Sequence, residues 1–342
     1  MGKTRQHKSE YWQAIRGVCI LVVIMIHCPT GQEFTPTDTY AWLILRQFIN
    51  FPVALFIFMA GYFVNVDKAQ HNTRSYALNR GGRLLVPYLV WSSVYIVKDW
   101  LITGEVSLKH IIYAYCTGKA ATPFYYIVVL VQLTLLTPWL VRMKNRRWLY
   151  MVTPTYLVIL YIYNLATGSM PRLYETVFPA WFSFYVLGLD CRSGKWVNVC
   201  RRAKNWWIAA VLGLSIIEAF VLLRVGCAIG FASSQIRFGS FLYAGLIALV
   251  LMKGKDMENE DGKLRKLMVS IGDCSYGIFY VHILVLIVVR KIISALWVSQ
   301  MWIYDFLICF VLTAAGSYLI VWVTKRIAEK IDAEKVLRII GF

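Results

Sequence analysis

The chain has 342 residues, of which 59% are hydrophobic and only 16% carry a charge. A soluble domain has about 25% charged residues, and the mean hydropathy of +0.58 is also high. The formal net charge is +18, but the basic residues lie in short segments between apolar runs, as the positive-inside rule requires. The composition therefore excludes a soluble domain, and the charge distribution excludes a nucleic acid as the partner.

The apolar runs are long enough for transmembrane helices, which need about 17–25 residues each. The alternating pattern of a membrane β-barrel is missing. We therefore predict an all-α, polytopic membrane protein with about ten transmembrane helices. The predicted spans cover residues 11–29, 42–66, 84–103, 123–141, 148–167, 177–191, 206–223, 235–252, 272–293 and 301–324.

The loops between these spans alternate in charge. Of the 36 lysines and arginines, 26 lie in segments on the side of the N-terminus and 6 on the opposite side. This bias, together with an even number of spans, predicts that both termini are cytoplasmic. Residues 1–324 then form the membrane domain. Residues 325–342 are predicted to be a cytoplasmic amphipathic tail, with basic residues opposite Ile and Val.

The first predicted span contains one arginine, Arg16, and one histidine, His27. Ionisable residues inside a membrane span are costly and are candidates for function. An offset of eleven residues rotates a helix by only about 20°, so the two side chains share a face and lie roughly 16 Å apart along the axis. The alternative is that Arg16 reaches the lipid headgroups and His27 lies at the far interface.

Two further arginines, Arg80 and Arg83, precede the third predicted span on the cytoplasmic side. At a spacing of i, i+3 they face the same way if this stretch is helical. Such a pair suits a polyanion such as a pyrophosphate. Ordinary positive-inside anchoring is the alternative.

Other polar residues inside or beside the spans are candidates for binding a substrate. Glu218 in the seventh span is either the structural partner of an arginine or part of an acceptor site, because an isolated carboxylate in a membrane is expensive. A histidine in the ninth span either hydrogen-bonds to a neighbouring span or belongs to the site. The substrate-binding candidates are Arg46, Tyr126, Glu218, Arg237 and His282.

Four motifs in this order resemble the membrane-bound acyltransferase family 3, the ten-span acyl-CoA:carbohydrate O-acyltransferases. The resemblance covers essentially the whole chain. Arg16 and His27 match the family's Arg-x10-His, and Arg80-Gly-Gly-Arg83 matches its RxxR. Residues 50–61 resemble its F-V-P-x-F-F-x-x-S-G segment, with Ala60 in place of serine, and residues 275–282 resemble its S-Y-G-I-Y-L-x-H segment.

The resemblance implies a stand-alone enzyme of the bacterial cytoplasmic (inner) membrane. Its co-substrate would be acetyl-CoA or another acyl-CoA, and its acceptor a hydroxyl of an extracytoplasmic or lipid-linked sugar or surface polysaccharide. Arg16 and His27 would be catalytic, with His27, whose ordinary pKa is about 6.5, as general base. Arg80, Arg83 and Arg16 would hold the CoA phosphates. Direct transfer and an acyl-histidine intermediate both stay open.

The remaining expectations concern partners and a second class of function. Membrane lipids are partners, and a homo-oligomer is compatible with the sequence. No metal site is expected, because the eight cysteines are scattered without a Cys-x-x-Cys pair or a His/Cys ligand spacing. The alternative function is a transporter or flippase for a lipid-linked or anionic substrate. No inverted repeat supports it, and a single stripe with Arg and His is not its signature.

Overall fold

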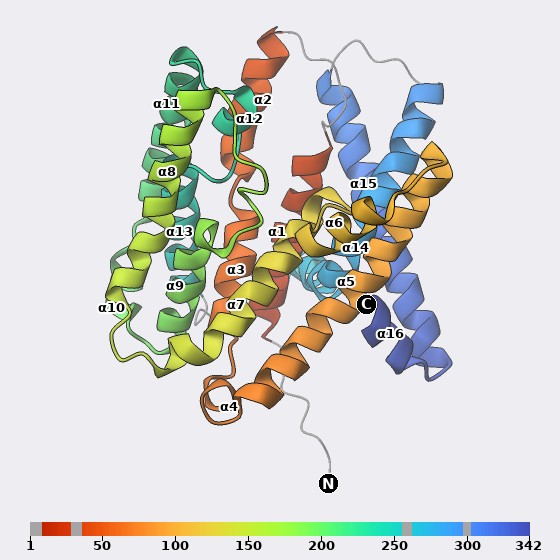
Figure 1. Ribbon diagram of the computed structural model, residues 1–342, viewed down its shortest axis with the longest axis horizontal. Helices are drawn as coiled ribbons and strands as arrows, with labels where there is room; N and C mark the ends of the chain where they lie inside the picture. Colours follow the sequence, from red (N-terminus) through yellow and green to blue (C-terminus); the bar gives the residue numbers. More distant parts are fainter. Residues whose placement is uncertain (1–8, 29–35, 255–261, 297–301) are drawn as a thin grey trace. The chain divides into compact units, whose positions relative to one another are not determined.

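A computed structural model describes residues 9–28, 36–254, 262–296 and 302–342, and the regular structure within these ranges is entirely helical (Figure 1). The chain divides into two compact units. The first comprises Met1–Glu33, Lys253–Glu334 and Phe342, so it joins the two ends of the chain. The second comprises Phe34–Met252 and Lys335–Gly341.

Eight helices within the described ranges are long and apolar enough to cross a membrane. Two predicted spans, 177–191 and 235–252, correspond to shorter helices, α9 (Phe182–Arg192) and α13 (Phe238–Gly254). The prediction of an all-α polytopic membrane protein is thus confirmed, whereas ten crossings and cytoplasmic termini stay predictions. The eight long segments are Glu10–His27, Asp38–Tyr62, Thr73–Thr103, Thr122–Arg142, Arg147–Thr167, Asn205–Arg224, Lys263–Leu296 and Trp302–Lys330.

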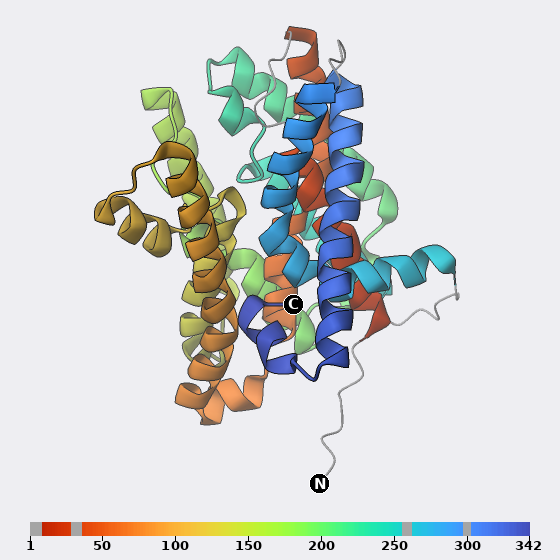
Figure 2. The same cartoon turned by 90° about the vertical axis from the view of Figure 1, so that its right-hand side faces the viewer.

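The first unit contains α1 (Glu10–His27), α14 (Lys263–Leu296) and α15 (Trp302–Lys330). Helices α14 and α15 run side by side in both views (Figures 1 and 2). Helices α1 and α14 approach even more closely, at two glycines. A Cβ atom added at Gly17 would lie 2.1 Å from the carbonyl oxygen of Met268, and one at Gly272 would lie 1.8 Å from that of Gln13. Small residues allow this close packing of backbones, as in other membrane helix pairs.

The second unit has a similar glycine contact between α3 (Pro52–Tyr62) and α9. A Cβ atom at Gly61 would lie 2.2 Å from the carbonyl oxygen of Tyr185, and one at Gly188 would lie 2.1 Å from that of Phe58. The predicted span 42–66 is interrupted before α3, because α2 (Pro36–Ile49) ends at Ile49 and Pro52 begins the next helix. Proline lacks an amide hydrogen and is favoured in the first turn of a helix.

The long helices of the second unit are α5 (Thr73–Thr103), α7 (Tyr125–Arg142), α8 (Val152–Thr167) and α11 (Asn205–Arg224). Its short helices are α4 (Val66–His71), α6 (Leu108–Thr117), α10 (Val197–Arg202) and α12 (Ile229–Ala232). Three 3₁₀ turns cover Thr122–Phe124, Arg147–Met151 and Phe178–Ala180.

The predicted tail, residues 325–342, is divided between two helices. Helix α15 continues to Lys330, and α16 (Glu334–Ile340) follows it. The indole N–H of Trp91 on α5 donates to the carbonyl oxygen of Ile340 at 2.8 Å. This bond ties the end of α16 to a long helix of the second unit. The cytoplasmic location of the tail stays a prediction.

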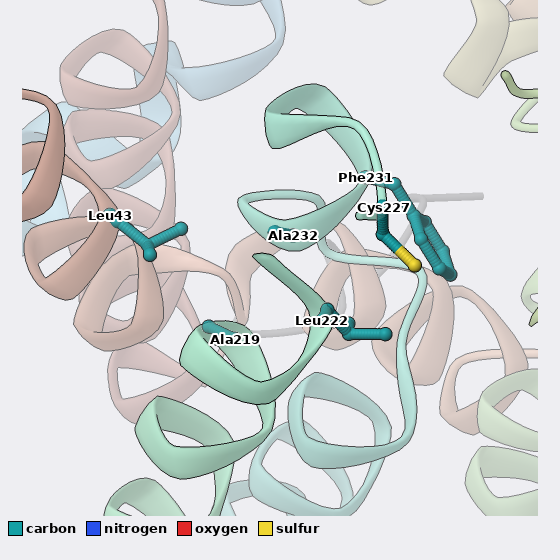
Figure 3. Close-up of a cluster of buried hydrophobic side chains, with 6 residues drawn as sticks. All are labelled: Leu43, Ala219, Leu222, Cys227, Phe231 and Ala232. Atoms are coloured by element: carbon teal, nitrogen blue, oxygen red, sulfur yellow. The ribbon is translucent and has the colours of Figure 1, made fainter. Parts of the chain in front are cut away.

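A buried apolar cluster joins three segments of the second unit (Figure 3). Leu43 comes from α2, Ala219 and Leu222 come from α11, Cys227 follows α11, and Phe231 and Ala232 come from α12. The cluster holds together helices that also carry buried polar side chains. These polar groups form part of the candidate site described below.

Candidate functional site

Arg16 and His27 lie on one uninterrupted helix, α1, and both side chains are half-buried. The helix therefore provides the regular geometry from which a shared stripe is expected. The roles proposed for the two residues stay predictions. His282, which lies on α14, is in the same unit.

A hydrogen-bonded chain connects Arg16 to the neighbouring helix. Its Nη1 donates to Oε1 of Gln13 at 3.2 Å, and Nε2 of Gln13 donates to Oδ1 of Asp273 on α14 at 2.8 Å. Gln13 is buried, so its amide is fixed between the two helices. Our sequence analysis missed Gln13 and Asp273. Two features of the sequence could have indicated them. Gln13 and Arg16 have an i, i+3 spacing, and Asp273 is a carboxylate inside the predicted span 272–293.

The other end of α1 is held by Arg290 of α14. Its Nη2 donates to the carbonyl oxygen of His27 at 3.3 Å and also to that of Cys28. The last carbonyls of a helix have no partner within the helix, and a cation satisfies them both by hydrogen bonding and by its charge. Arg290 therefore fixes the backbone of the residue proposed as base. The sequence pattern did not identify Arg290, because a cation near the end of a predicted span is expected to face the adjacent loop.

His27 and His282 are brought together. Their ring centroids are 5.5 Å apart, with the planes inclined at 46°. His282 is fully buried, and its Nδ1 lies 3.0 Å and 2.8 Å from the carbonyl oxygens of Ile278 and Phe279. Since a carbonyl only accepts, we assign the proton to Nδ1. This leaves a lone pair on Nε2, which has no hydrogen-bond partner among the described residues.

Arg80 and Arg83 both belong to α5, in the second unit. This helix begins at Thr73 and not at residue 84, because Asn72 caps it by accepting a hydrogen bond from the Ser75 amide at 3.1 Å. The two arginines are therefore helical, and the expected i, i+3 relation holds. Arg80 is half-buried and donates to the carbonyl oxygen of Ala60 at 2.8 Å, whereas Arg83 is exposed.

Glu218 and Arg237 form a buried ion pair in the second unit. Nη1 of Arg237 donates to Oε2 of Glu218 at 3.0 Å, and the Gly239 amide donates to the same oxygen at 2.9 Å. The Tyr161 hydroxyl donates to Oε1 of Glu218, and Arg237 also donates to Gln47. Both carboxylate oxygens are thus used within the protein, which favours the structural alternative for Glu218.

Replacing Glu218 by glutamine should therefore destabilise the protein by about 3–5 kcal/mol, because it leaves the guanidinium of Arg237 buried without a counter-charge. The measurement is thermal or chemical unfolding of purified protein in detergent. Glu175→Gln is the matched control, since Glu175 pairs with Lys119 at the surface at 2.9 Å. Its loss should stay below about 1 kcal/mol. Equal losses in the two variants would contradict a structural role for the Glu218 pair.

Arg46 and Tyr126 complete the predicted substrate-binding residues. The side chain of Arg46 lies over the ring of Trp42, and its Nε donates to the carbonyl oxygen of Ser233 at 3.1 Å. The ring of Tyr126 packs edge-on against Phe56 at a centroid distance of 6.2 Å. Of the five predicted substrate-binding residues, Arg46 and His282 have buried side-chain nitrogens with no hydrogen-bond partner among the described residues.

An apolar cavity of about 630 Å³ lies within the second unit, and no predicted site residue lines it. Its walls include Trp196, Trp206, Trp207, Phe184 and Phe241. Within the described ranges, no group of three or more His, Cys, Asp or Glu side chains is arranged to hold a metal ion.

Comparison with known proteins supports one family. The model of acyltransferase family 3, described as an acyltransferase domain, matches residues 9–322. No curated protein and no solved structure matches the chain. The match covers nearly the whole sequence and includes α1, α5 and α14. The chain therefore belongs to acyltransferase family 3 and is a membrane acyltransferase.

Proposed function

We propose that the protein transfers an acyl group, acetyl in the simplest case, from cytoplasmic acyl-CoA to a hydroxyl of an extracytoplasmic or lipid-linked sugar. The observation that carries the proposal is the pairing of two imidazoles 5.5 Å apart, that of His27 on the helix that also carries Arg16 and that of His282 on α14. Family membership supports acyl transfer in general. The donor, the acceptor and the location in a bacterial inner membrane are part of our proposal.

In the proposed reaction, the imidazole of His27 accepts the proton of the acceptor hydroxyl. The oxygen of that hydroxyl attacks the thioester carbonyl at the same time. A new C–O bond forms, the C–S bond breaks, and the CoA thiolate leaves and takes up the proton. General-base catalysis of this kind contributes about 10²–10⁴-fold to the rate. A donor and an acceptor held together provide a further large factor.

His282 supports this role as a positioning residue. A catalytic histidine needs a partner that fixes the orientation and tautomer of its ring. His282 lies beside His27, its own Nδ1 is held by two carbonyl oxygens, and its Nε2 can accept one hydrogen bond. Arg290 complements it by holding the backbone of His27.

The phosphates of CoA are assigned to Arg80 and Arg83, which lie one turn apart on α5. Arg83→Ala should weaken CoA binding about tenfold or more, because a hydrogen bond between charged groups contributes about 1.5–3 kcal/mol. The measurement is a titration of purified protein with CoA and with dephospho-CoA. Arg74→Ala is the matched control, since Arg74 is an exposed arginine on the same helix. Equal effects of the two variants would favour simple membrane anchoring.

Release of free thiol tests the reaction itself. Purified protein is given acetyl-CoA and a glycan acceptor, and thiol is followed over time. Acceptor-dependent thiol release supports the transferase. Movement of a labelled acceptor across a vesicle membrane without thiol release would support the alternative of a transporter or flippase.

A further inference from the structure

Arg46 is a buried cation without a counter-ion among the residues that the structure describes. Three arginines in the part of the chain that the structure describes are buried, with at most 8% of their surface exposed. Arg146 pairs with Asp190 at 2.6 Å, and Arg237 pairs with Glu218 at 3.0 Å. Within the described residues Arg46 has no such carboxylate: its Nε donates to the Ser233 carbonyl, its guanidinium lies over the Trp42 ring, and its Nη1 has no hydrogen-bond partner.

The surroundings of Arg46 do not neutralise it. Arg237 lies close enough to add to the positive potential, and its charge is balanced by Glu218 alone. Glu175, in the loop before α9 and next to Tyr174, is paired with Lys119. Arg46, Arg237 and Glu218 together therefore carry one net positive charge. An uncompensated buried charge is costly, and within the described residues no carboxylate balances Arg46, so an anionic ligand would stabilise it.

Two side-chain amide oxygens, those of Asn50 and Gln235, lack a hydrogen-bond donor among the described residues. Asn50 donates through Nδ2 to the carbonyl oxygens of Ser233 and Ser234, both at 3.1 Å, and its buried Oδ1 has no partner. Gln235 donates through Nε2 to the Tyr125 hydroxyl at 2.9 Å, and its Oε1 has no partner either. These oxygens require donors such as hydroxyl groups.

The Tyr174 phenol is a further neighbour, in the loop before α9. Burial raises the pKa of Tyr174, the adjacent Glu175 raises it further, and the Arg46 guanidinium opposes them. The field of Arg46 therefore reaches the Tyr174 hydroxyl. The Tyr125 hydroxyl is likewise within electrostatic range of Arg46.

We propose that Arg46, Asn50 and Gln235 bind the acceptor and that this acceptor is an acidic sugar, with a carboxylate for Arg46 and hydroxyls for the two amide oxygens. This inference rests on the proposed function and specifies its substrate class. A lipid phosphodiester without a hydroxylated headgroup supplies the anion but not the hydroxyl donors. Ordered water supplies the donors but not the anion. A sugar acid supplies both within one ligand.

Binding of three probes to the purified protein tests the assignment. We expect glucuronate to raise the thermal unfolding midpoint in a saturable manner and glucose to leave it unchanged. Arg46→Gln should weaken glucuronate binding about tenfold or more. Arg224→Gln, which removes an exposed arginine at the end of α11, should bind normally. A response of wild type to inorganic phosphate that equals the glucuronate response would overturn the acidic-sugar assignment, as would glucuronate binding to Arg46→Gln with unchanged affinity.

Gln235→Glu provides a second test if the Arg46→Gln protein does not fold. Gln235→Glu places a carboxylate beside the Tyr125 hydroxyl and within the field of Arg46. It should raise the unfolding midpoint of the protein without ligand and abolish glucuronate binding, because the chain then carries its own counter-ion. A lower midpoint with intact glucuronate binding would contradict the proposal. The binding measurement needs no turnover, so a failure of acyl transfer is seen separately in the thiol assay.

Discussion

Replacing Gly272 by alanine should prevent the first unit from assembling. The added Cβ would lie 1.8 Å from the carbonyl oxygen of Gln13 and 3.1 Å from the amide nitrogen of Gly17, and both are backbone atoms that cannot rotate away. Helices α1 and α14 would have to separate by more than an ångström. Separation would break the Gln13–Asp273 hydrogen bond, which is 2.8 Å long. Overpacking alone costs about 1–3 kcal/mol or more, and loss of the part-buried hydrogen bond, which leaves the buried amide of Gln13 unpaired, adds up to about 1–3 kcal/mol.

We expect little monodisperse Gly272→Ala protein after extraction in detergent, and thermal unfolding at a much lower temperature in any that is recovered. The matched control is Gly213→Ala on α11, where an added Cβ meets nothing within 4 Å. That variant should be as stable as wild type or more stable, since alanine favours helix over glycine by about 1 kcal/mol. A stable Gly272→Ala protein would show that the two helices do not pack as described.

Replacing His27 by alanine should lower acyl transfer by about 10²–10⁴-fold, the usual contribution of a general base, and leave the protein folded. The side chain is only half-buried, so its removal creates no large cavity. The measurement is the initial rate of acceptor-dependent thiol release under saturating acetyl-CoA. The rate of wild type should fall as the pH is lowered, because a protonated imidazole cannot accept the hydroxyl proton.

His110→Ala is the matched control for His27. His110 is an exposed histidine near the start of α6, and its removal should leave the rate unchanged. His282→Ala should reduce kcat with little change in KM for acetyl-CoA, because His282 acts through His27. A His27→Ala protein with the wild-type rate and fold would remove the basis of the proposed mechanism.

Much of the helical organisation could be predicted from apolar runs, and the reasons for the differences are local. The first span was predicted correctly, since nothing between Tyr11 and His27 interrupts a helix. Helix α5, which contains the third predicted span, starts earlier than the apolar run because Asn72 caps it. The second predicted span is broken because two residues separate Ile49 from Pro52.

The side-chain partners were much harder to predict, because they depend on which helices meet. Asp273 and Arg290 contact α1 only because two glycines bring α1 and α14 together, and a single sequence does not indicate that pairing. For Glu218 the sequence left open an arginine partner or a place in an acceptor site, and the structure pairs it with Arg237. The charge of Arg46, unbalanced among the described residues, depends on the pairing of Glu218 with Arg237 and of Glu175 with Lys119, which the sequence does not indicate.

The pairing of α1 with α14 also determines when the candidate catalytic face can form during biosynthesis. Gln13 and its partner Asp273 are 260 residues apart in the chain. At about 5–20 residues per second, a ribosome needs roughly 13–50 s to make that length. Throughout this interval α1 is already available for insertion. The residues of α14 that hold it, Gly272, Asp273 and Arg290, have not yet been synthesised. Nascent chains in this state depend on lipid, the insertion machinery or chaperones to shield Arg16 and Gln13.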